Sequence, residues 1–404
     1  MTDASGRPLR ILSLAPTSFF NDYGCHVRIL EEARALTAAG HTVDVLTYFK
    51  GNTPAGVRVI RTSPTPWHAR YEVGSSRHKY AFDILLAIRL ARVLIAQRYD
   101  IIHGHLHEGA LIGGLIGRLW GTPVCMDYQG ALTDEMTQHG FLPADRPRQR
   151  AFWERIERLA ERQGSVIFTS TEASATALRR RWPTKRIIAL PDGVGVRFVR
   201  PDRLSAEERI VRRAALGIPP DADVAIFLGL LARHQGIDDI LLAAQRLSER
   251  RPNLHWLVYG FPGVSGWRDR ALRSGLADRV HFAGRVPYEQ MPDRLALADL
   301  ALAPKRSLTE GSGKILNYMA MGLPTVAYDT PAQRELLGEL GRYAPFGDIA
   351  AFAEQVDALL EDRARWRELG RALRQRAENT FSWERGAETM IRAYRGILPA
   401  SPHS

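Results

Sequence analysis

Residues 308–317 hold the side chains best suited to binding an anionic ligand in this 404-residue chain. Gly311 and Gly313 let the backbone approach a ligand closely. Between them, Ser312 can cap a helix or bind an oxygen, and Lys314 supplies a point charge suited to a diphosphate. A glycine-rich turn with a capping serine would have the same sequence, so the pattern alone leaves both readings open.

Two residues beside this turn offer groups for a sugar. Asn317 follows Lys314 by three positions, so a helix places both on one face. Asn317 can then contact a ribose while Lys314 holds phosphates. Glu310, before the helix, can accept hydrogen bonds from sugar hydroxyls.

Loops after two other predicted strands are further candidates. The loop 229–236 contains Gly229, Arg233 and Gln235, and its two polar side chains could face the same diphosphate. Gly24 ends the loop after the first strand and lets a backbone N–H approach a ligand. Neither loop has the G-x-G-x-x-G pattern, so a nicotinamide cofactor is disfavoured.

Three histidines at alternate positions form another constellation: His103, His105 and His107. If the segment is extended they share one face, but in a row rather than converging on one metal ion, which disfavours zinc. We expect one or two of them to point into a cleft and the rest to be structural. Asp127 and Gln129, at the end of a later strand, either hydrogen-bond a polar ligand or satisfy the strand end.

Strand and helix patterns alternate along the whole chain and place these loops after strands. Repeated β-α units predict a parallel sheet covered by helices, and the alternation starts afresh at Val224–Leu228. The sequence therefore predicts an α/β protein with two doubly wound Rossmann-like domains, residues 1–198 and 199–380. The amphipathic segment in 381–404 needs a surface to cover, and the first domain is the candidate.

Composition excludes several classes of protein. Hydrophobic residues make up 45% and charged residues 25%, which argues against disorder and against a membrane-embedded chain. The two cysteines show no zinc spacing, which favours a reducing compartment. No signal peptide or spanning helix is recognised, so we expect a cytoplasmic protein.

Positive charge is concentrated in the first half. Residues 1–200 carry 27 Lys+Arg and 18 Asp+Glu, or +9 of the net +11. This favours an anionic partner, such as a membrane surface or a phosphorylated acceptor. A solvated arginine-rich surface is the alternative, and nucleic acid is least favoured because no aromatic platform is interleaved. The candidate surface combines residues 148–163 with Arg179, Arg180, Arg181, Lys185 and Arg186.

Five segments, in this order, carry a resemblance to a known family: residues 40–43, 100–105, 191–194, 310–324 and 381–384. They include Asp-Ile-Ile-His-Gly-His, Pro-Asp-Gly-Val and the Glu310 turn with its helix. The chain resembles the family 4 glycosyltransferases of the GT-B fold.

This resemblance implies a nucleoside diphosphate sugar, UDP- or GDP-linked, bound mostly by the second domain. It implies an acceptor on the first domain, for which His105, Glu108 and Asp127 are the candidates. Transfer would retain the anomeric configuration without an essential metal or cofactor. Glu310 and Asn317 look like the family's contacts to the donor sugar and to the ribose.

The phosphate loop departs from the family pattern. Leu230 and Gln235 stand where the family usually has an arginine and a lysine. Lys314 and Arg233 are the nearest replacements, and we expect Lys314 to carry most of the diphosphate recognition.

The catalytic positions depart as well. The family has a glutamate eight residues after the first, whereas Asn317 follows Glu310 by seven and is an amide. Gln129 stands where the family often has a histidine and cannot act as a general base. Glu310 and Gln129 are therefore the catalytic candidates, with Gln129 in a positioning role.

The predicted function is transfer of a sugar to a hydroxyl on a lipid-linked, polysaccharide or other glycan acceptor, with the protein peripheral at the inner face of a membrane. Another GT-B enzyme, such as an epimerase or a phosphorylase, is an alternative. A non-catalytic nucleotide-sugar-binding protein is the other.

Overall fold

The computed structural model describes residues 6–21, 24–64, 79–138, 142, 146–306 and 312–399. The chain divides into two compact units. The first unit comprises residues 1–192 and 383–404, and the second comprises 193–382. The first predicted boundary, after residue 198, lies a few residues further along the chain than the observed division after 192. The second, after residue 380, lies two residues before the observed division after 382.

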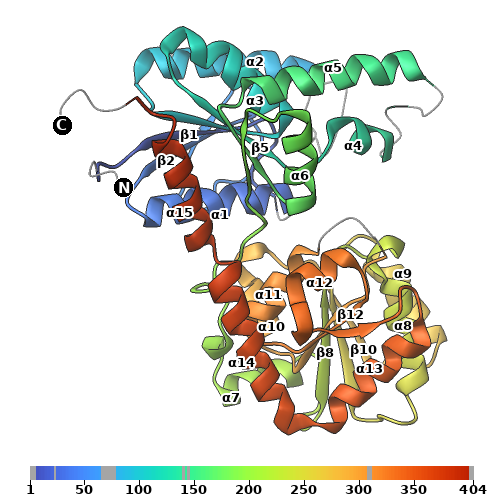
Figure 1. The fold of residues 1–404 in the computed structure, drawn as a ribbon. Helices are drawn as coiled ribbons and strands as arrows, with labels where there is room; N and C mark the ends of the chain where they lie inside the picture. Colours follow the sequence, from blue (N-terminus) through green and yellow to red (C-terminus); the bar gives the residue numbers. More distant parts are fainter. Residues whose placement is uncertain are drawn as a thin grey trace. The chain divides into compact units, whose positions relative to one another are not determined.

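The first unit is a seven-stranded parallel sheet with helices on both faces (Figure 1). The strand order is β3-β2-β1-β4-β5-β6-β7, so the order reverses between β1 and β4. The strands are β1 (Arg10–Ala15), β2 (Thr42–Thr47), β3 (Arg58–Arg61), β4 (Ile101–His105), β5 (Val124–Tyr128), β6 (Val166–Thr169) and β7 (Arg186–Ala189). The helices are α1 (Gly24–Ala38), α2 (Lys79–Ala96), α3 (Leu106–Gly117), α4 (Leu132–Gln138), α5 (Pro147–Gln163), α6 (Glu172–Arg181) and α15 (Trp383–Arg395), with a short 3-10 turn η1 (Arg118–Trp120).

The second unit repeats this plan with six parallel strands in the order β10-β9-β8-β11-β12-β13. Its strands are β8 (Asp223–Leu228), β9 (Leu254–Tyr259), β10 (Val280–Gly284), β11 (Leu300–Ala303), β12 (Thr325–Tyr328) and β13 (Arg342–Ala344). Its α-helices are α7 (Ala206–Ala214), α8 (Ile237–Leu247), α9 (Val264–Arg273), α10 (Met291–Leu295), α11 (Gly313–Met321), α12 (Pro331–Leu337), α13 (Ile349–Glu361) and α14 (Arg363–Thr380). Its 3-10 turns are η2 (Pro201–Arg203), η3 (Arg233–Gln235), η4 (Tyr288–Gln290) and η5 (Gly338–Leu340).

The burial of the central strands explains why they could be predicted from the sequence. The central strands β1, β4, β8 and β11 are buried almost throughout, as expected for a sheet covered on both faces. The short edge strand β13 was not predicted. It spans three residues, two of them only half-buried, and therefore lacks a continuous apolar run.

The C-terminal helix covers the first unit, as predicted. Helix α15 packs along α1 and buries Trp383, Met390 and Tyr394 (Figure 1). The Tyr394 hydroxyl is hydrogen-bonded to Nδ1 of His103 on β4. The apolar stripe predicted from the sequence therefore packs on a unit whose strand β4 lies almost 300 residues earlier in the chain.

The expected row of three histidines holds for only two of them. Strand β4 ends at His105, and Leu106 takes a left-handed backbone conformation with φ 59°. His103 and His105 therefore stack on each other, whereas His107 lies on α3 against the ring of Tyr128.

Candidate functional site

The carboxyl ends of β8 and β11 carry the donor-site candidates of the second unit. The strand order reverses between these two strands, and ligands of open α/β sheets bind at such a point. The loop after β8 contains Gly229 and Gln235, and the segment after β11 leads into α11 and Lys314. These two segments are about 80 residues apart in the sequence, and the pairing of β8 with β11 brings them close together.

Lys314 is held at the centre of this edge. Its Nζ donates a hydrogen bond to Oε1 of Gln235 at 2.9 Å and lies 4.1 Å from the ring centroid of Phe227. A Cβ placed on Gly229 would come within 2.6 Å of the same Nζ, so the glycine leaves room for the lysine. The structure therefore brings together Gly229, Gln235 and Lys314.

Helix α11 is anchored so that its first turn faces this edge. The backbone N–H of Leu228 donates to the hydroxyl of Tyr318 at 2.9 Å, which ties α11 to the end of β8. Ser312, the N-cap, makes no capping hydrogen bond, and its buried Oγ has no partner among the described residues. Gly313 is exposed and Asn317 half-buried on the same helix. A hydroxyl in this position, at a helix N-terminus, suits an anion.

Of the other predicted donor residues, two lie outside the described part of the chain and one has a different charged partner. Glu310 and Gly311 lie outside the described residues. The side chain of Arg233 is 93% exposed and its nearest charged partner is Asp238 at 3.7 Å, not the Lys314 group. In the described parts of this edge, Lys314 is thus the better placed of the two expected phosphate cations.

Lys305 was missed by sequence reasoning. It lies two residues beyond β11 and is buried. Burial, reinforced by the positive charge of Lys305, lowers the pKa of Lys314 to about 7. A lysine two residues after a central parallel strand was the signal available in the sequence.

The corresponding edge of the first unit is a buried ion-pair network centred on Asp127. Its carboxylate accepts hydrogen bonds from Nη2 of Arg28 at 2.9 Å, from Nδ1 of His105 at 3.0 Å and from Nε2 of Gln129 at 2.7 Å. Burial acts to raise the pKa of Asp127, but the charge of Arg28 and the His105 hydrogen bond outweigh it and hold that pKa far below its usual range. Asp127 is therefore an anion at neutral pH.

The predicted acceptor residues make hydrogen bonds and ion pairs with other residues of the first unit. His105 is buried, and its Nε2 accepts from the hydroxyl of Ser13 at 2.8 Å while Nδ1–H faces Asp127. Glu108 accepts from Nζ of Lys79 at 2.7 Å. Burial acts to raise the pKa of Glu108, but the charge of Lys79 lowers it overall. Half-buried Gln129 has a side-chain hydrogen bond to Asp127, and Gly24 is the exposed first residue of α1.

Arg28 is the important residue that sequence reasoning missed. It is buried on α1 and also contacts Glu32 at 3.0 Å, the Leu190 carbonyl at 3.1 Å and Asp192 at 2.9 Å. Burial raises the pKa of Glu32 well above its usual value, so Asp127 is the main anionic partner of Arg28. An arginine within a helical sequence is normally predicted to be exposed. Only the contacts of Arg28 with residues distant in the sequence show that it is buried.

Comparisons with known proteins bear on what these edges do. Residues 23–193 match the family described as "Glycosyl transferase 4-like domain", and residues 208–380 match "Glycosyl transferases group 1". Together the two matches take in nearly all of both units. The chain belongs to the glycosyltransferase group 1 family.

Full-length relatives differ in what they act on. This glycosyltransferase is 27% identical to a 2-deoxystreptamine N-acetyl-D-glucosaminyltransferase of Streptomyces fradiae, covering 87% of this chain and 86% of the relative. It is 24% identical to a phosphatidyl-myo-inositol mannosyltransferase of Mycobacterium leprae, covering 96% and 97%. The solved structure of Anabaena Alr3699/HepE in complex with UDP-glucose has a TM-score of 0.72, at 16% identity, covering 96% and 100%. The shared fold is GT-B.

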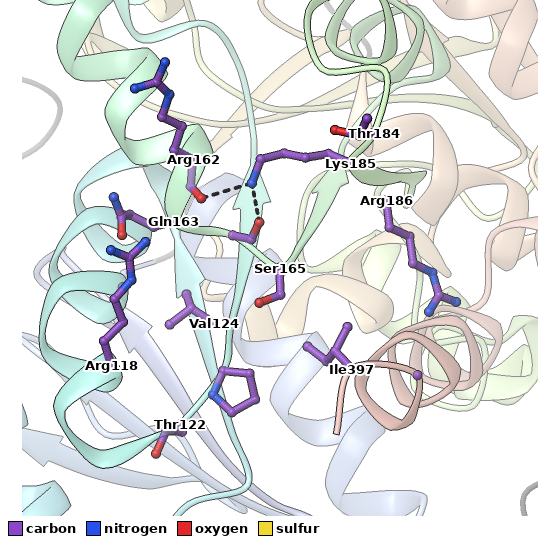
Figure 2. Close-up of a pocket in the computed structure, with 14 residues that line it drawn as sticks. Arg118, Thr122, Val124, Arg162, Gln163, Ser165, Thr184, Lys185, Arg186 and Ile397 are labelled. Carbon is purple, nitrogen blue, oxygen red and sulfur yellow. Dashed lines mark hydrogen bonds between the residues drawn. The ribbon is translucent and has the colours of Figure 1, made fainter. Parts of the chain in front are cut away.

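A cavity of about 530 Å³ lies at the other edge of the first sheet, where β5, β6 and β7 begin (Figure 2). Its basic wall includes Lys185, whose Nζ donates to the carbonyls of Arg162 and Gly164 at 3.0 and 2.7 Å. Lysine at a helix C-terminus stabilises the free carbonyls there. In this glycosyltransferase Lys185 therefore has a structural role at the end of α5, and the cavity lies at the edge of the sheet opposite the carboxyl-edge residues.

Proposed function

We propose that this glycosyltransferase moves a sugar from a nucleoside diphosphate sugar to a hydroxyl acceptor, with retention of anomeric configuration and without an essential metal or cofactor. The observation that supports it best is the Lys314 group: a half-buried lysine in the first turn of a helix, next to a Ser312 hydroxyl that has no partner among the described residues. A diphosphate supplies the negative charge that such a site lacks.

The other proposed donor contacts follow from their positions. Gly229, Gln235, Ser312 and Gly313 would surround the phosphates, and Asn317, one turn along α11, would hydrogen-bond the ribose. Glu310 and Gln129 would act on the donor sugar. Because the protein would stabilise the charge of the departing diphosphate, catalysis would rest on positioning and electrostatics.

We propose an acceptor bound by the first unit, on a lipid-linked or other glycan precursor. The name of the Mycobacterium leprae relative, which refers to a phosphatidyl-inositol, and the net charge of +9 in residues 1–200 support a lipid-linked acceptor at an anionic membrane. A cytoplasmic protein, peripheral at the inner face, would fit this. In the described residues, no helix has the length and apolarity needed to cross a bilayer.

Thermal unfolding with added nucleotides tests the donor proposal. UDP or GDP at about 100 times its Kd is expected to raise Tm by about 5 °C or more, because it binds only the folded state. The matching monophosphate should raise Tm less, since it lacks one phosphate for Lys314. If neither UDP nor GDP raises Tm, the proposal is refuted.

Turnover separates the alternatives. Nucleoside diphosphate released only when an acceptor is present supports a transferase, whereas release without acceptor points to another GT-B activity. Binding without release across an acceptor panel points to a nucleotide-sugar-binding protein. Proton NMR of the product decides retention, and unchanged rates in a chelator decide metal independence.

The pKa of Lys314 makes donor binding depend on pH. Its pKa, about 7 in the free protein, should rise when a diphosphate binds, so binding takes up a proton above pH 7. Affinity for a nucleotide sugar should be constant below that pH and should fall by up to about tenfold per pH unit above it. Calorimetry in buffers of different ionisation enthalpy measures the proton uptake.

Lys314→Arg is the control for this pH dependence. A guanidinium stays charged across the range, so the variant should bind with little change between about pH 6 and 9. An equal fall in affinity for wild type and variant would assign the titration to another group.

A further inference from the structure

Exposed apolar side chains in the first unit gather on three helices. All nine large hydrophobic residues that are exposed in its described part lie on α2, α3 with η1, or α5. They are Tyr80, Ile84, Ile88, Ile95, Leu115, Leu119, Trp120, Phe152 and Leu159. Exposure reaches 63% at Ile84, 72% at Ile95 and 77% at Leu119. Single exposed apolar residues are ordinary, but a gathered set marks an interaction surface.

The three helices are neighbours, so these residues share one surface, here named the α2/α3/α5 face. Lys79 of α2 is ion-paired with Glu108 of α3 at 2.7 Å, and the ring of Tyr80 stacks on Trp153 of α5. Gly114 of α3 packs against Gln163 of α5. Figure 1 shows α2, α3 and α5 on the opposite side of the first sheet from α1 and α15.

Exposed arginines outnumber exposed acidic residues among the apolar residues. Seven exposed arginines lie on these helices: Arg92, Arg118, Arg148, Arg150, Arg155, Arg158 and Arg162. Of the five acids on the same helices none is fully exposed. Glu154, the most exposed at 40%, bridges Arg150 and Arg158. The face is therefore both apolar and cationic.

The positive charge of the α2/α3/α5 face indicates what kind of partner can bind it. A second copy presenting the same face would oppose arginines with arginines, and like charges disfavour such contact. A lipid surface with anionic headgroups offers phosphates to the arginines and acyl chains to the isoleucines and leucines, as interfacial helices require.

We propose that the α2/α3/α5 face docks this protein on an anionic lipid bilayer. Ile84, Ile88 and Ile95 enter the headgroup–acyl boundary, and the arginines bind lipid phosphates. The inference rests on the lipid-linked acceptor in the proposed function and names the surface that reaches it.

The surface expected from the sequence overlaps this face in part. Its helix 148–163 belongs to the face, whereas Arg179 and Arg181 of α6 have partners within the first unit. Arg179 binds Glu172 and the Ile187 carbonyl, and Arg181 binds Glu161 at 2.7 Å. Burial acts to lower the pKa of Arg181, but the charges of Glu161 and Glu157 raise it overall. The exposed apolar residues lie instead on α2, α3 and α5.

Co-sedimentation with vesicles, without any sugar donor, tests the proposal. The full chain should bind vesicles of phosphatidylcholine with about 30% phosphatidylglycerol at least fivefold more than phosphatidylcholine alone, and about 0.5 M salt should reduce this binding. Ile84→Glu with Ile88→Glu should lower binding at least fivefold, because it places carboxylates against anionic lipid. Arg155→Ala with Arg158→Ala should lower it at low salt only.

Matched controls keep the outcome interpretable. Leu242→Glu with Leu272→Glu changes two exposed leucines of the second unit and should leave vesicle binding intact. If the Ile84/Ile88 variant does not fold, Ile95→Glu with Leu119→Glu replaces it. Equal binding by wild type and face variants overturns the proposal, and so does a wild-type dimer in sedimentation velocity that the face variants dissociate. A Tm shift with UDP or GDP that persists in the face variants shows that donor binding is unaffected, so the two proposals fail separately.

Discussion

Lys314→Ala is expected to lower kcat/KM for the nucleotide sugar about 100-fold or more. The side chain is half-buried at the carboxyl edge of β8 and β11, with Gln235 as its hydrogen-bonding partner and Phe227 beneath it. Removing it leaves the diphosphate with no cation in that position. Steady-state kinetics over a range of donor concentrations measures the effect and separates KM from kcat.

Two comparisons locate the effect. Arg233→Ala should cost less than about tenfold, because the guanidinium is 93% exposed and screened by water. Arg246→Ala, which removes an exposed charge from the far end of α8, should leave the kinetics unchanged. Wild-type kinetics for Lys314→Ala would contradict the donor assignment.

Arg28→Met is expected to destabilise the first unit by about 3–5 kcal/mol, because it leaves the Asp127 carboxylate buried without its cation. The substitution keeps the aliphatic stem and removes only the charged fork. Guanidinium unfolding, followed by circular dichroism, measures the change. Arg34→Met, on the same helix with a half-buried side chain, is the matched control and should cost less than about 1 kcal/mol.

The pH dependence and a second substitution test the cause. In the wild type the lowered pKa of Asp127 contributes stability above the usual aspartate pKa, and this is lost as the pH falls. In Arg28→Met the Asp127 pKa should instead be raised, so stability is lost as the pH rises, and the difference in stability between the two proteins should shrink progressively as the pH falls. Adding Asp127→Asn should restore much of the loss at neutral pH. A deficit independent of pH would assign it to packing.

Prediction from sequence succeeded where local patterns carry the information. The runs at Ile11–Leu14 and Val224–Phe227 are buried on both faces, and such strands are continuous apolar stretches. The alternation of these strands with helices gave the two doubly wound units. The α15 stripe, with Trp383 and Tyr394 at helical spacing, gave the covering helix.

Prediction failed where a side chain's partner comes from far along the chain. Arg28, with partners from β5 and from residues 190–192, has no local signature of burial. The partners of Asp127 and His105 were not predicted either, since Arg28 and Ser13 come from other elements. Of the α2/α3/α5 face only the helix 148–163 was predicted, because periodicity shows an apolar stripe but not which helices lie beside it.

The sequence alone thus determined the order of strands and helices, the family resemblance and the glycine-lysine turn at the start of α11, since each depends on residues close together in the chain. Only the tertiary structure decided which candidates lie together: Gln235 and Gly229 reach Lys314 because β8 and β11 pair at the point where strand order reverses. Burial, pKa and exposed surface are properties of such long-range contacts. They arise only when distant segments exclude water from one another.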